Sequence, residues 1–430
     1  MKKATLWLPY TQMQTADVPL EVVATQNTTL ILNDGRQLID SLASWWTACH
    51  GYNHPHLVQA IKNQAAFLPH VMMGGLIHPQ VKKLSQRIAA LLPAGLNHVF
   101  FSESGSVSVE IAMKMALQYW QNQRMPHRTQ FVSFEYGYHG DTFYTMSICD
   151  PVEGMHRLFQ GVLPAQFCRL IPTTVCLLEA FGSWLSENAD NVAAVIIEPL
   201  VQGAGGMKMH DAATLKAIAQ ICKQHHTLLI ADEIFTGFGR TGTMFACDQA
   251  PIVPDIICLS KALTGGTLPL AATIACDTIY QAFLGKSAEK ALMHGSTFMG
   301  NALACAAANA SLDLFESEPR LAQVLQIEKI LKSELQDLVN LPGVKAVRIK
   351  GAIGAVQLER PLGEDFKWFS QQFIELGIWN RPLGDIIYTT PAFTIEPADL
   401  FKITAAINLL VTKWSTSIYT TPSRTFLNAL

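Results

Sequence analysis

Two segments of the sequence could bind opposite ends of a small charged ligand. Ser104-Gly105-Ser106 lies between a short apolar strand and a helical pattern. Free backbone N–H groups and the positive end of a helix dipole could hold a phosphate there. Asp232 ends the apolar run Leu228–Ala231. A carboxylate at the end of a buried strand needs a cation or hydrogen-bond donors, and a protonated ring nitrogen would satisfy it.

Two further segments could supply a nucleophile and an aromatic surface. Lys261 follows the apolar run Ile256–Leu259 and enters a glycine-rich loop, residues 262–266. Desolvation there favours the neutral amine, which is the nucleophilic form of lysine. In Tyr136–Asp141 glycines separate aromatic residues, and a flat ring could stack on such a turn.

Each of these four segments also has an ordinary structural explanation: an N-cap, a salt-bridged carboxylate, a surface lysine and a packed aromatic turn. One ligand, pyridoxal 5′-phosphate (PLP), needs all four. Its phosphate needs a helix N-terminus, its aldehyde a lysine amine, its pyridinium nitrogen a carboxylate, and its ring an aromatic face. The combination therefore predicts a PLP site more specifically than any single segment does.

The elements that position these residues alternate between strands and helices from about residue 70 to about residue 310. One predicted helix begins at Ser106 and a second at Asp211, each with an apolar face at helical spacing. Uninterrupted apolar strands between helices predict a parallel sheet covered on both faces, with the ligand beyond the carboxyl ends of the strands. The predicted strands are Val99–Ser102, Gln130–Phe134, Ala193–Ile197, Thr227–Ala231, Asp255–Leu259 and Leu270–Ala275.

The two ends of the chain differ in texture from this central block. Short strands are predicted at Thr28–Leu32 and Gln37–Asp40, and again at Val344–Ile349 and Ala355–Leu358. We therefore expect residues 1–60 and 316–430 to contribute the two parts of a small α+β domain, around a large domain at 61–315. The last thirty residues are expected to form a loosely held tail.

Composition excludes several classes of protein. The 430 residues carry a net charge of −3, 49% are apolar and 15% are charged. These values exclude disorder, a coiled coil and nucleic-acid binding through a large positive field. The low fraction of charged residues suggests that part of the surface is buried against another subunit.

No apolar run reaches the roughly 18 residues of a membrane span, and the first ten residues are too short for a secretory signal, so a cytoplasmic protein is expected. Nine scattered cysteines without a C-x-x-C motif predict reduced, mostly buried thiols, and no metal-binding spacing occurs.

The segment 229–266, LIADEIFTGFGRTGTMFACDQAPIVPDIICLSKALTGG, resembles the PLP-binding signature of class III (subgroup II) aminotransferases. The resemblance extends over about residues 5–400, through further segments at 44–55, 104–120, 138–142, 198–207 and 294–305. It implies an α/β fold, the PLP-dependent transferase fold type I, with a mostly parallel sheet covered by helices in the large domain. It also implies that Lys261 binds the cofactor covalently and then transfers protons, while Asp232 holds the pyridinium.

The resemblance assigns further roles around the cofactor. Gly105 and Ser106 would bind the phosphate, Tyr138 would stack on the ring and take part in catalysis, and Glu198 would lie near the edge of the cofactor. Ser296 and Thr297 resemble a segment that reaches the phosphate from the neighbouring subunit, which implies a homodimer with shared sites. Proline is usual in the family where Ser296 stands.

The same resemblance implies a substrate pocket and a carboxylate anchor. Arg381 would bind a substrate carboxylate through its planar fork, and Arg240 is a second candidate with a supporting role expected. Asn380 departs from a position that is often apolar in the family. The implied walls of the pocket are Tyr10, Trp45, Trp46, Gly295 and Tyr388.

The tryptophan pair and Trp379–Pro382 narrow the resemblance to the branch that moves the amino group of S-adenosylmethionine to 8-amino-7-oxononanoate in biotin biosynthesis. Three alternatives stay open: lysine as the donor, another class III ω-aminotransferase acting on substrates such as ornithine or 4-aminobutyrate, and a non-catalytic PLP-binding module. A half-reaction with each donor discriminates among them. No membrane or nucleic-acid partner is expected.

Overall fold

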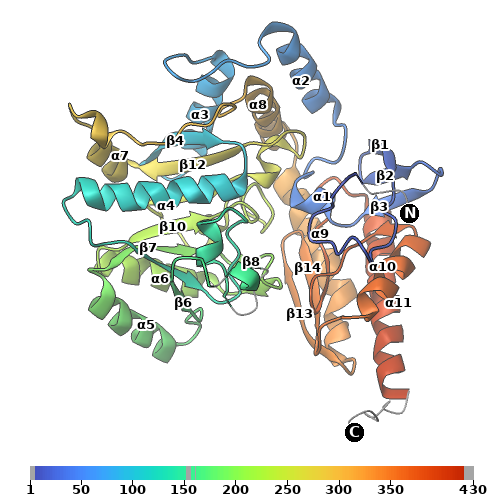
Figure 1. Cartoon of the computed structure of the whole chain (residues 1–430). Coiled ribbons are helices and arrows are strands. Elements are labelled where there is room, and N and C mark those ends of the chain that lie inside the picture. The colour runs from blue at the N-terminus through green and yellow to red at the C-terminus, as the bar shows by residue number, and fades with distance from the viewer. Residues whose placement is uncertain (1–4, 152–155, 160, 421–430) are drawn as a thin grey trace.

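The computed structural model describes residues 5–151, 156–159 and 161–420 of the chain. A seven-stranded sheet forms its centre, in the strand order β4-β12-β11-β10-β7-β5-β6 (Figure 1). Neighbouring strands run parallel except where β12 pairs with β11 and with β4. The bounds are β4 Leu96–Ser102, β5 Gln130–Phe134, β6 Phe167–Arg169, β7 Val192–Ile197, β10 Leu228–Asp232, β11 Ile256–Leu259 and β12 Ala271–Cys276.

The predicted, mostly parallel sheet is confirmed, with two differences. Strand β6 was not predicted, because three partly exposed residues at a sheet edge carry no distinct apolar pattern. Strand β12 was expected to be parallel and is antiparallel. Its connection from β11, residues 260–270, is shorter than the roughly dozen residues that a crossover to a parallel strand requires.

Strand β10 shows why the central strands are apolar on both faces. Leu228 and Ile230 pack in one cluster with α4 (Gly105–Asn122), which crosses one face of the sheet (Figure 1). Leu229 and Ala231 pack in a second cluster with residues of α5 (Val175–Asn188) and α6 (Ala212–Gln224). Successive side chains of a strand point to opposite faces, so a sheet covered on both faces needs apolar residues at every position.

Both predicted helix starts are capped by side chains. Ser104 Oγ accepts a hydrogen bond from the Val107 N–H at 3.3 Å and begins α4. Asp211 accepts one from the Thr214 N–H at 2.7 Å and begins α6. Each cap satisfies a backbone donor that has no partner inside the helix. The buried face of α4 includes the predicted residues Val109, Met113, Ala116 and Trp120.

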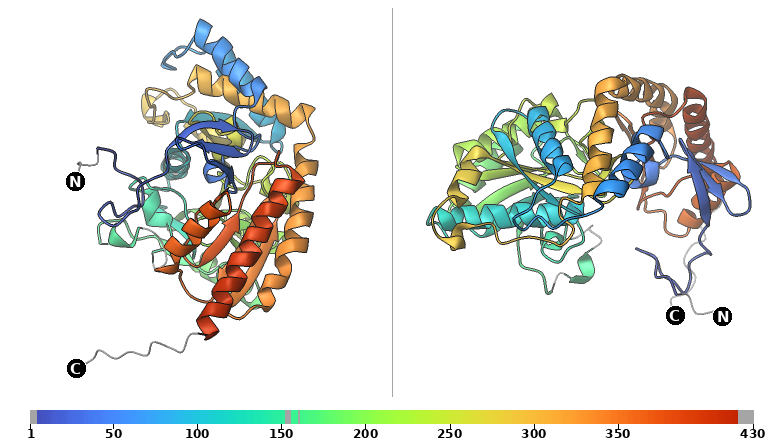
Figure 2. Two further views of the ribbon diagram at one scale, coloured as in Figure 1. Left: turned by 90° about the vertical axis from the view of Figure 1, so that its right-hand side faces the viewer. Right: turned by 90° about the horizontal axis from the view of Figure 1, so that it is seen from above.

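The N-terminal and C-terminal parts of the chain share one small sheet of order β1-β2-β3-β15. Its strands are β1 Val22–Gln26, β2 Thr29–Leu32, β3 Gln37–Asp40 and β15 Ile378–Trp379, and β15 runs parallel to β3. A second sheet joins β13 Val344–Lys350, β14 Ile353–Leu358 and β16 Ile386–Thr389. Figure 2 shows the N-terminal strands and the C-terminal helices together at one side of the large sheet. The predicted α+β part built from both ends is thus present, while the domain boundaries stay predictions.

The remaining helices frame these sheets. Helices α9 (Arg320–Leu335) and α10 (Asp365–Glu375) belong to the small part, together with α11 (Pro397–Thr420). The other elements are α1 Ala43–Trp46, α2 Pro55–Phe67, α3 Pro79–Leu91, α7 Asp277–Phe283, α8 Ala302–Ser317 and the two-residue strands β8 Val201–Gln202 and β9 Lys208–Met209.

The expectation of a loose C-terminal tail is wrong up to residue 420. Helix α11 continues through this region, and Leu410, Val411 and Trp414 are buried in the main core. These residues have helical spacing, but the polar residues 415–417 that follow them gave the segment the appearance of a tail. Residues 421–430 lie outside the described part of the chain.

All nine cysteines are free thiols and six of them are buried, as predicted. Among the described residues, none of the helices is long and apolar enough to cross a membrane. The cytoplasmic location stays a prediction.

Candidate active site

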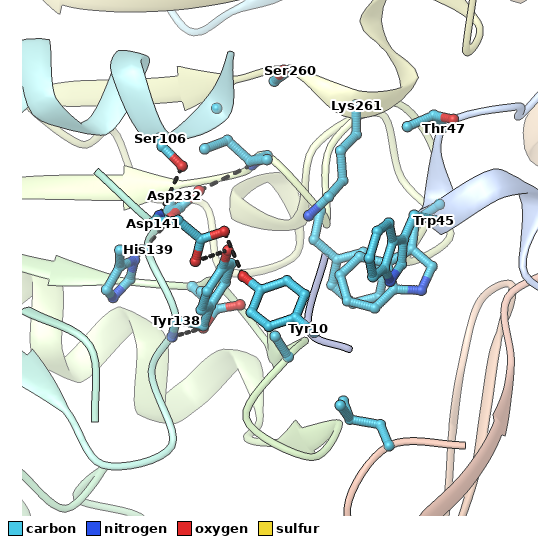
Figure 3. A pocket seen from close by; sticks show the side chains of 18 of the residues that line it. Tyr10, Trp45, Thr47, Ser106, Tyr138, His139, Asp141, Asp232, Ser260 and Lys261 are labelled. Atoms are coloured by element: carbon cyan, nitrogen blue, oxygen red, sulfur yellow. Dashed lines mark hydrogen bonds and ion pairs between the residues drawn. The ribbon is translucent and has the colours of Figure 1, made fainter. Parts of the chain in front are cut away.

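A cavity of about 590 Å³ lies where the carboxyl ends of β4, β7, β10 and β11 meet the small part of the chain. Figure 3 shows Lys261 pointing into this cavity. Tyr10 and Tyr138 lie on one side of its amine, and Trp45 lies on the other. The predicted site residues that line it are Tyr10, Trp45, Trp46, Gly105, Ser106, Tyr138, Glu198, Asp232, Lys261, Arg381 and Tyr388. Gly295, Ser296 and Thr297 do not line the cavity of their own chain.

Lys261 follows β11 after one intervening residue, Ser260, and begins a short 3-10 turn. Its φ of 30° is in the left-handed region, which is uncommon for a residue other than glycine. The Nζ atom lies 4.4 Å from the centre of the Trp46 ring and 5.6 Å from the centre of the Phe235 ring. Aromatic rings thus border the amine and keep much of the surrounding water away from it.

Burial lowers the pKa of Lys261 to about 8. The negative charges of Asp232 and Glu198 oppose this shift, and the positive charge of Arg240 adds to it. At pH 7 about a tenth of the amine is then neutral, far more than for an exposed lysine, and the neutral form is the nucleophile and proton acceptor.

Asp232, the last residue of β10, forms a buried pair with His139. Asp232 Oδ2 lies 2.8 Å from His139 Nδ1, and Asp232 Oδ1 accepts a hydrogen bond from the Ile234 N–H at 3.2 Å. Both side chains are less than 5% exposed. His139 was not among the predicted site residues, although it lies inside the aromatic turn Tyr136–Asp141. The pair fixes the orientation of the carboxylate that faces the cavity.

The predicted anion-binding residues lie at the N-terminus of α4. Gly105 and Ser106 are in the first turn, where backbone N–H groups have no partner inside the helix. Ser106 Oγ accepts a hydrogen bond from the Asp141 N–H at 3.0 Å. Gly140 packs against this serine so closely that an added Cβ would lie 2.3 Å from Ser106 Oγ. A glycine is needed there, also because its φ is +127°.

Asp141 connects the two predicted tyrosines. Tyr138 OH donates to Asp141 Oδ1 at 2.9 Å, and Tyr10 OH donates a hydrogen bond to Asp141 Oδ2. Burial, followed by the hydrogen bond to Asp141, raises the pKa of Tyr10 to about 12. Burial and the Asp141 charge also raise the pKa of Tyr138. Both phenols therefore stay protonated, and the carboxylate holds them at one side of the cavity.

Glu198 is 5% exposed and follows β7. Its carboxylate accepts hydrogen bonds from the Tyr138 N–H at 2.9 Å and from the Gly203 N–H at 2.8 Å. Burial raises the pKa of Glu198 to about 7; the nearby charge of Asp232 adds to this, and His139 opposes it. Glu198 thus positions the backbone of the aromatic turn and contributes a charge that titrates near neutral pH.

The two tryptophans lie on a left-handed turn. The φ values are 47° at Ala43, 51° at Ser44, 61° at Trp45 and 75° at Trp46. Left-handed helical backbone costs an L-residue roughly 1–2 kcal/mol, so this turn needs support from its surroundings. Trp46 packs on Phe235 with ring centres 4.2 Å apart, whereas Trp45 is 48% exposed. Plain core packing therefore does not explain Trp45.

Arg381 lines the cavity beside aromatic rings. Its guanidinium carbon lies 6.0 Å from the centre of the Trp45 ring and 5.9 Å from the centre of the Phe366 ring. Among the residues that the structure describes, no carboxylate pairs with it within 4.0 Å. A planar cation that faces a cavity without an internal partner can bind a carboxylate ligand.

Arg240 is 1% exposed and does not line the cavity. Its Nη1 donates to the carbonyl oxygens of Ala352 at 3.2 Å and Pro391 at 2.7 Å. Arg240 therefore does not contact a ligand in this cavity, and its positive charge adds to the lowering of the Lys261 pKa. Its supporting role stays a prediction.

Comparisons with known proteins agree with the resemblance noted in the sequence. A family model described as aminotransferase class III matches residues 10–411. The adenosylmethionine-8-amino-7-oxononanoate aminotransferase of Corynebacterium glutamicum is 43% identical over 395 residues, which are 91% of this chain and 93% of that protein.

Two solved structures share the fold over nearly the whole chain. The crystal structure of the adenosylmethionine-8-amino-7-oxononanoate aminotransferase of Methanocaldococcus jannaschii has a TM-score of 0.90 and 34% identity, and the match covers 95% of this chain and 97% of that chain. A PLP-bound amine transaminase from an uncultivated Pseudomonas species has a TM-score of 0.87 and 30% identity, with coverage of 96% and 99%. The chain belongs to the class III aminotransferase family.

Proposed function

We propose that this aminotransferase moves the amino group of S-adenosylmethionine to 8-amino-7-oxononanoate and so produces 7,8-diaminononanoate, with PLP as its cofactor. The relatives named for this reaction match more than nine-tenths of the chain. The observation that carries the proposal is the Lys261 amine, which faces a cavity bordered by Trp46, Trp45 and Arg381.

The residues of the cavity have the chemistry that PLP requires. The first turn of α4 at Gly105 and Ser106 would hold the phosphate, and Asp232 would hold the protonated pyridine nitrogen. Lys261 would hold the cofactor through its amine, and Tyr138 would cover one face of the ring. When bound, PLP supplies an aldehyde that takes up the amino group of the substrate. It also supplies a ring that withdraws electrons from the substrate carbon that carries this amino group.

A single atom of the protein, Lys261 Nζ, would carry the protons that the reaction transfers. Lys261 Nζ, with a pKa of about 8, can accept a proton from the reacting carbon of the donor and return one to the product. The buried His139–Asp232 pair keeps the carboxylate in place throughout. The ring of Trp46, 4.4 Å from Nζ, excludes water that would compete for that proton.

The substrate pocket has features that would suit each of the two substrates in turn, with one carboxylate anchor for both. The aliphatic chain of the acceptor gains about 0.8 kcal/mol for each methylene buried against the aromatic walls. The sulfonium of the donor can lie on the face of Trp45 or Tyr10, because aromatic rings attract cations. Arg381, which lines the cavity near Trp45, would bind the carboxylate of either substrate.

We further propose a homodimer with shared active sites. Gly295, Ser296 and Thr297 lie outside the cavity of their own chain, as expected for a segment that completes the partner's site. The neighbouring Met293 and Phe298 are exposed in the single chain, and contact with a second subunit would cover them.

A single-turnover experiment tests the function. The PLP-loaded enzyme is mixed with S-adenosylmethionine, and the loss of the visible PLP absorbance is followed before 8-amino-7-oxononanoate is added. We expect transfer to the acceptor and recovery of the absorbance. Transfer from lysine but not from S-adenosylmethionine would favour the alternative donor. Failure with both, together with turnover of ornithine or 4-aminobutyrate, would overturn the proposal in favour of another class III activity.

A further inference from the structure

We propose that Asp40 is a positioning residue of this enzyme, whose carboxylate holds Ala43–Trp46 in the left-handed turn that sets both tryptophan walls of the substrate pocket. This inference rests on the proposed function only for the identity of the substrates. Asp40 is the last residue of β3 and does not line the cavity. Its effect on the reaction must therefore pass through the turn that it supports.

The carboxylate of Asp40 is 1% exposed and is surrounded by donors from the turn and its neighbours. Asp40 Oδ1 accepts a hydrogen bond from the Leu42 N–H at 2.9 Å, and Asp40 Oδ2 accepts one from the Ser44 N–H at 2.7 Å. Tyr52 OH donates to the same Oδ2 at 2.5 Å. Charge-assisted hydrogen bonds of this kind are stronger than those between neutral groups.

These bonds act where the backbone is least able to hold its own shape. Four consecutive residues without glycine have φ between 47° and 75°. The turn has its own backbone bonds, from the Trp46 N–H to the Leu42 carbonyl and from the Thr47 N–H to the Ala43 carbonyl, both at 2.9 Å. A right-handed turn could form similar bonds at a lower steric cost, so the backbone bonds alone do not select the left-handed form.

The turn is anchored on its N-terminal side by the joined ends of the chain. Asp40 pairs with Trp379 of β15, and the Ser41 N–H donates to the Trp379 carbonyl at 3.1 Å. Arg381 follows β15 after one intervening residue, Asn380. The same junction therefore positions the tryptophan turn and the carboxylate anchor relative to each other.

The consequences of a shift in this turn reach three parts of the site. The ring of Trp46 lies over Lys261 Nζ, and the ring of Trp45 lies against the Arg381 guanidinium and, edge-on at 6.4 Å, against Tyr10. If the turn relaxed toward the right-handed form, both rings would leave these positions together. The geometry thus predicts a loss of substrate affinity rather than a loss of the cofactor, whose proposed contacts lie on the large sheet.

The decisive variant is Asp40→Asn, which keeps the size of the side chain and replaces one acceptor by a donor. We expect the KM for both substrates to rise about tenfold, because donors of the turn lose a charged acceptor. PLP should still bind. The near-ultraviolet circular dichroism of the apoprotein should change as well, because the tryptophans move. Asp34→Asn, the same change at an exposed hairpin residue, is the matched control and should alter neither readout.

A rescue experiment separates positioning from general stability. Glycine adopts left-handed backbone without steric cost, so adding Ser44→Gly to Asp40→Asn should recover KM about threefold or more. If Asp40→Asn does not fold, Tyr52→Phe removes one donor from the same carboxylate and should raise KM about twofold to threefold. Unchanged KM and circular dichroism in the folded variant, or a loss that Ser44→Gly does not relieve, overturns the proposal.

The circular dichroism of the apoprotein needs no substrate. A wild-type enzyme that fails with S-adenosylmethionine would therefore refute the proposed function and leave the Asp40 comparison intact. With another amine donor that the enzyme accepts, the same KM comparison can then be made.

Discussion

Replacing Arg381 with alanine should weaken the binding of a substrate carboxylate while leaving the cofactor in place. The guanidinium lines the cavity, lies near the rings of Trp45 and Phe366, and has no internal carboxylate partner among the described residues. Its removal therefore takes away an interaction with the ligand without leaving a buried charge unpaired inside the protein.

The expected loss of binding free energy depends on how much water reaches the ion pair between Arg381 and the substrate carboxylate. Exposed ion pairs contribute about 0.2–1 kcal/mol, and hydrogen bonds to charged groups contribute about 1.5–3 kcal/mol. Arg381 is partly exposed, but two aromatic rings shield one side of it. We therefore expect a loss of about 2 kcal/mol, which corresponds to about a 30-fold rise in KM.

The assay compares 8-amino-7-oxononanoate with its methyl ester, which has the same chain without the negative charge. The wild-type enzyme should prefer the free acid, and Arg381→Ala should lose this preference by lowering activity on the acid alone. Arg381→Lys keeps the charge without the planar fork and should give an intermediate KM. Arg36→Ala removes an exposed arginine that pairs with Asp34 in the hairpin turn, and should change nothing.

The same variant should be measured with S-adenosylmethionine, because the donor also has a carboxylate. An unchanged KM for both substrates would refute the assignment of Arg381 as the anchor. An equal loss on the acid and the methyl ester would also contradict it, since the effect would then be steric.

Three further predictions concern the cofactor site and the subunits. The rate at which the apoprotein takes up PLP should rise with pH up to about 8 and then level off, because burial lowers the pKa of Lys261 and the neutral amine reacts. Glu198→Gln should move this midpoint to lower pH, since the charge of Glu198 favours the protonated amine; a shift to higher pH would contradict the assigned cause. Gly140→Ala should weaken the binding of PLP and of inorganic phosphate, because the added methyl group crowds the N-terminus of α4. Gly182→Ala, where an added Cβ meets nothing closer than 3.9 Å, is the control and should bind both ligands normally. If both variants bind phosphate with the same affinity, the placement of the phosphate is wrong. A 1:1 mixture of inactive Lys261→Ala and inactive Thr297→Asp chains, allowed to exchange subunits, should regain about a quarter of wild-type activity if the sites are shared, because about half of the dimers are mixed and each mixed dimer has one intact site. No activity should return if each chain has its own complete site.

The sequence was most informative where the chemistry is local. Ser104, Asp232 and Lys261 each follow an apolar strand, and a parallel sheet brings the carboxyl ends of its strands to one edge. The positions of these groups could therefore be predicted without any knowledge of tertiary contacts. The family signature in the same segment supported this placement.

Features that depend on distant contacts could not be predicted in the same way. Asp141 joins Tyr10 and Tyr138, but Tyr10 is 131 positions away from it in the sequence. The left-handed turn at Ala43–Trp46 contains no glycine, so no residue type announced its backbone conformation. It depends on Asp40 and on β15 from the other end of the chain. Strand β12 has the composition of a parallel strand, and its antiparallel direction is seen only in its pairing with β11 and β4.

The central claim is that Lys261 is the residue through which the enzyme holds PLP in this cavity. The most direct measurement is to load the enzyme with PLP, reduce it with borohydride, digest it and locate the phosphopyridoxyl group by mass spectrometry. We predict that the group is found on the peptide containing Lys261, and that prior incubation with S-adenosylmethionine prevents the labelling. Labelling of another lysine, or no labelling in a fully folded enzyme supplied with PLP, would contradict the account.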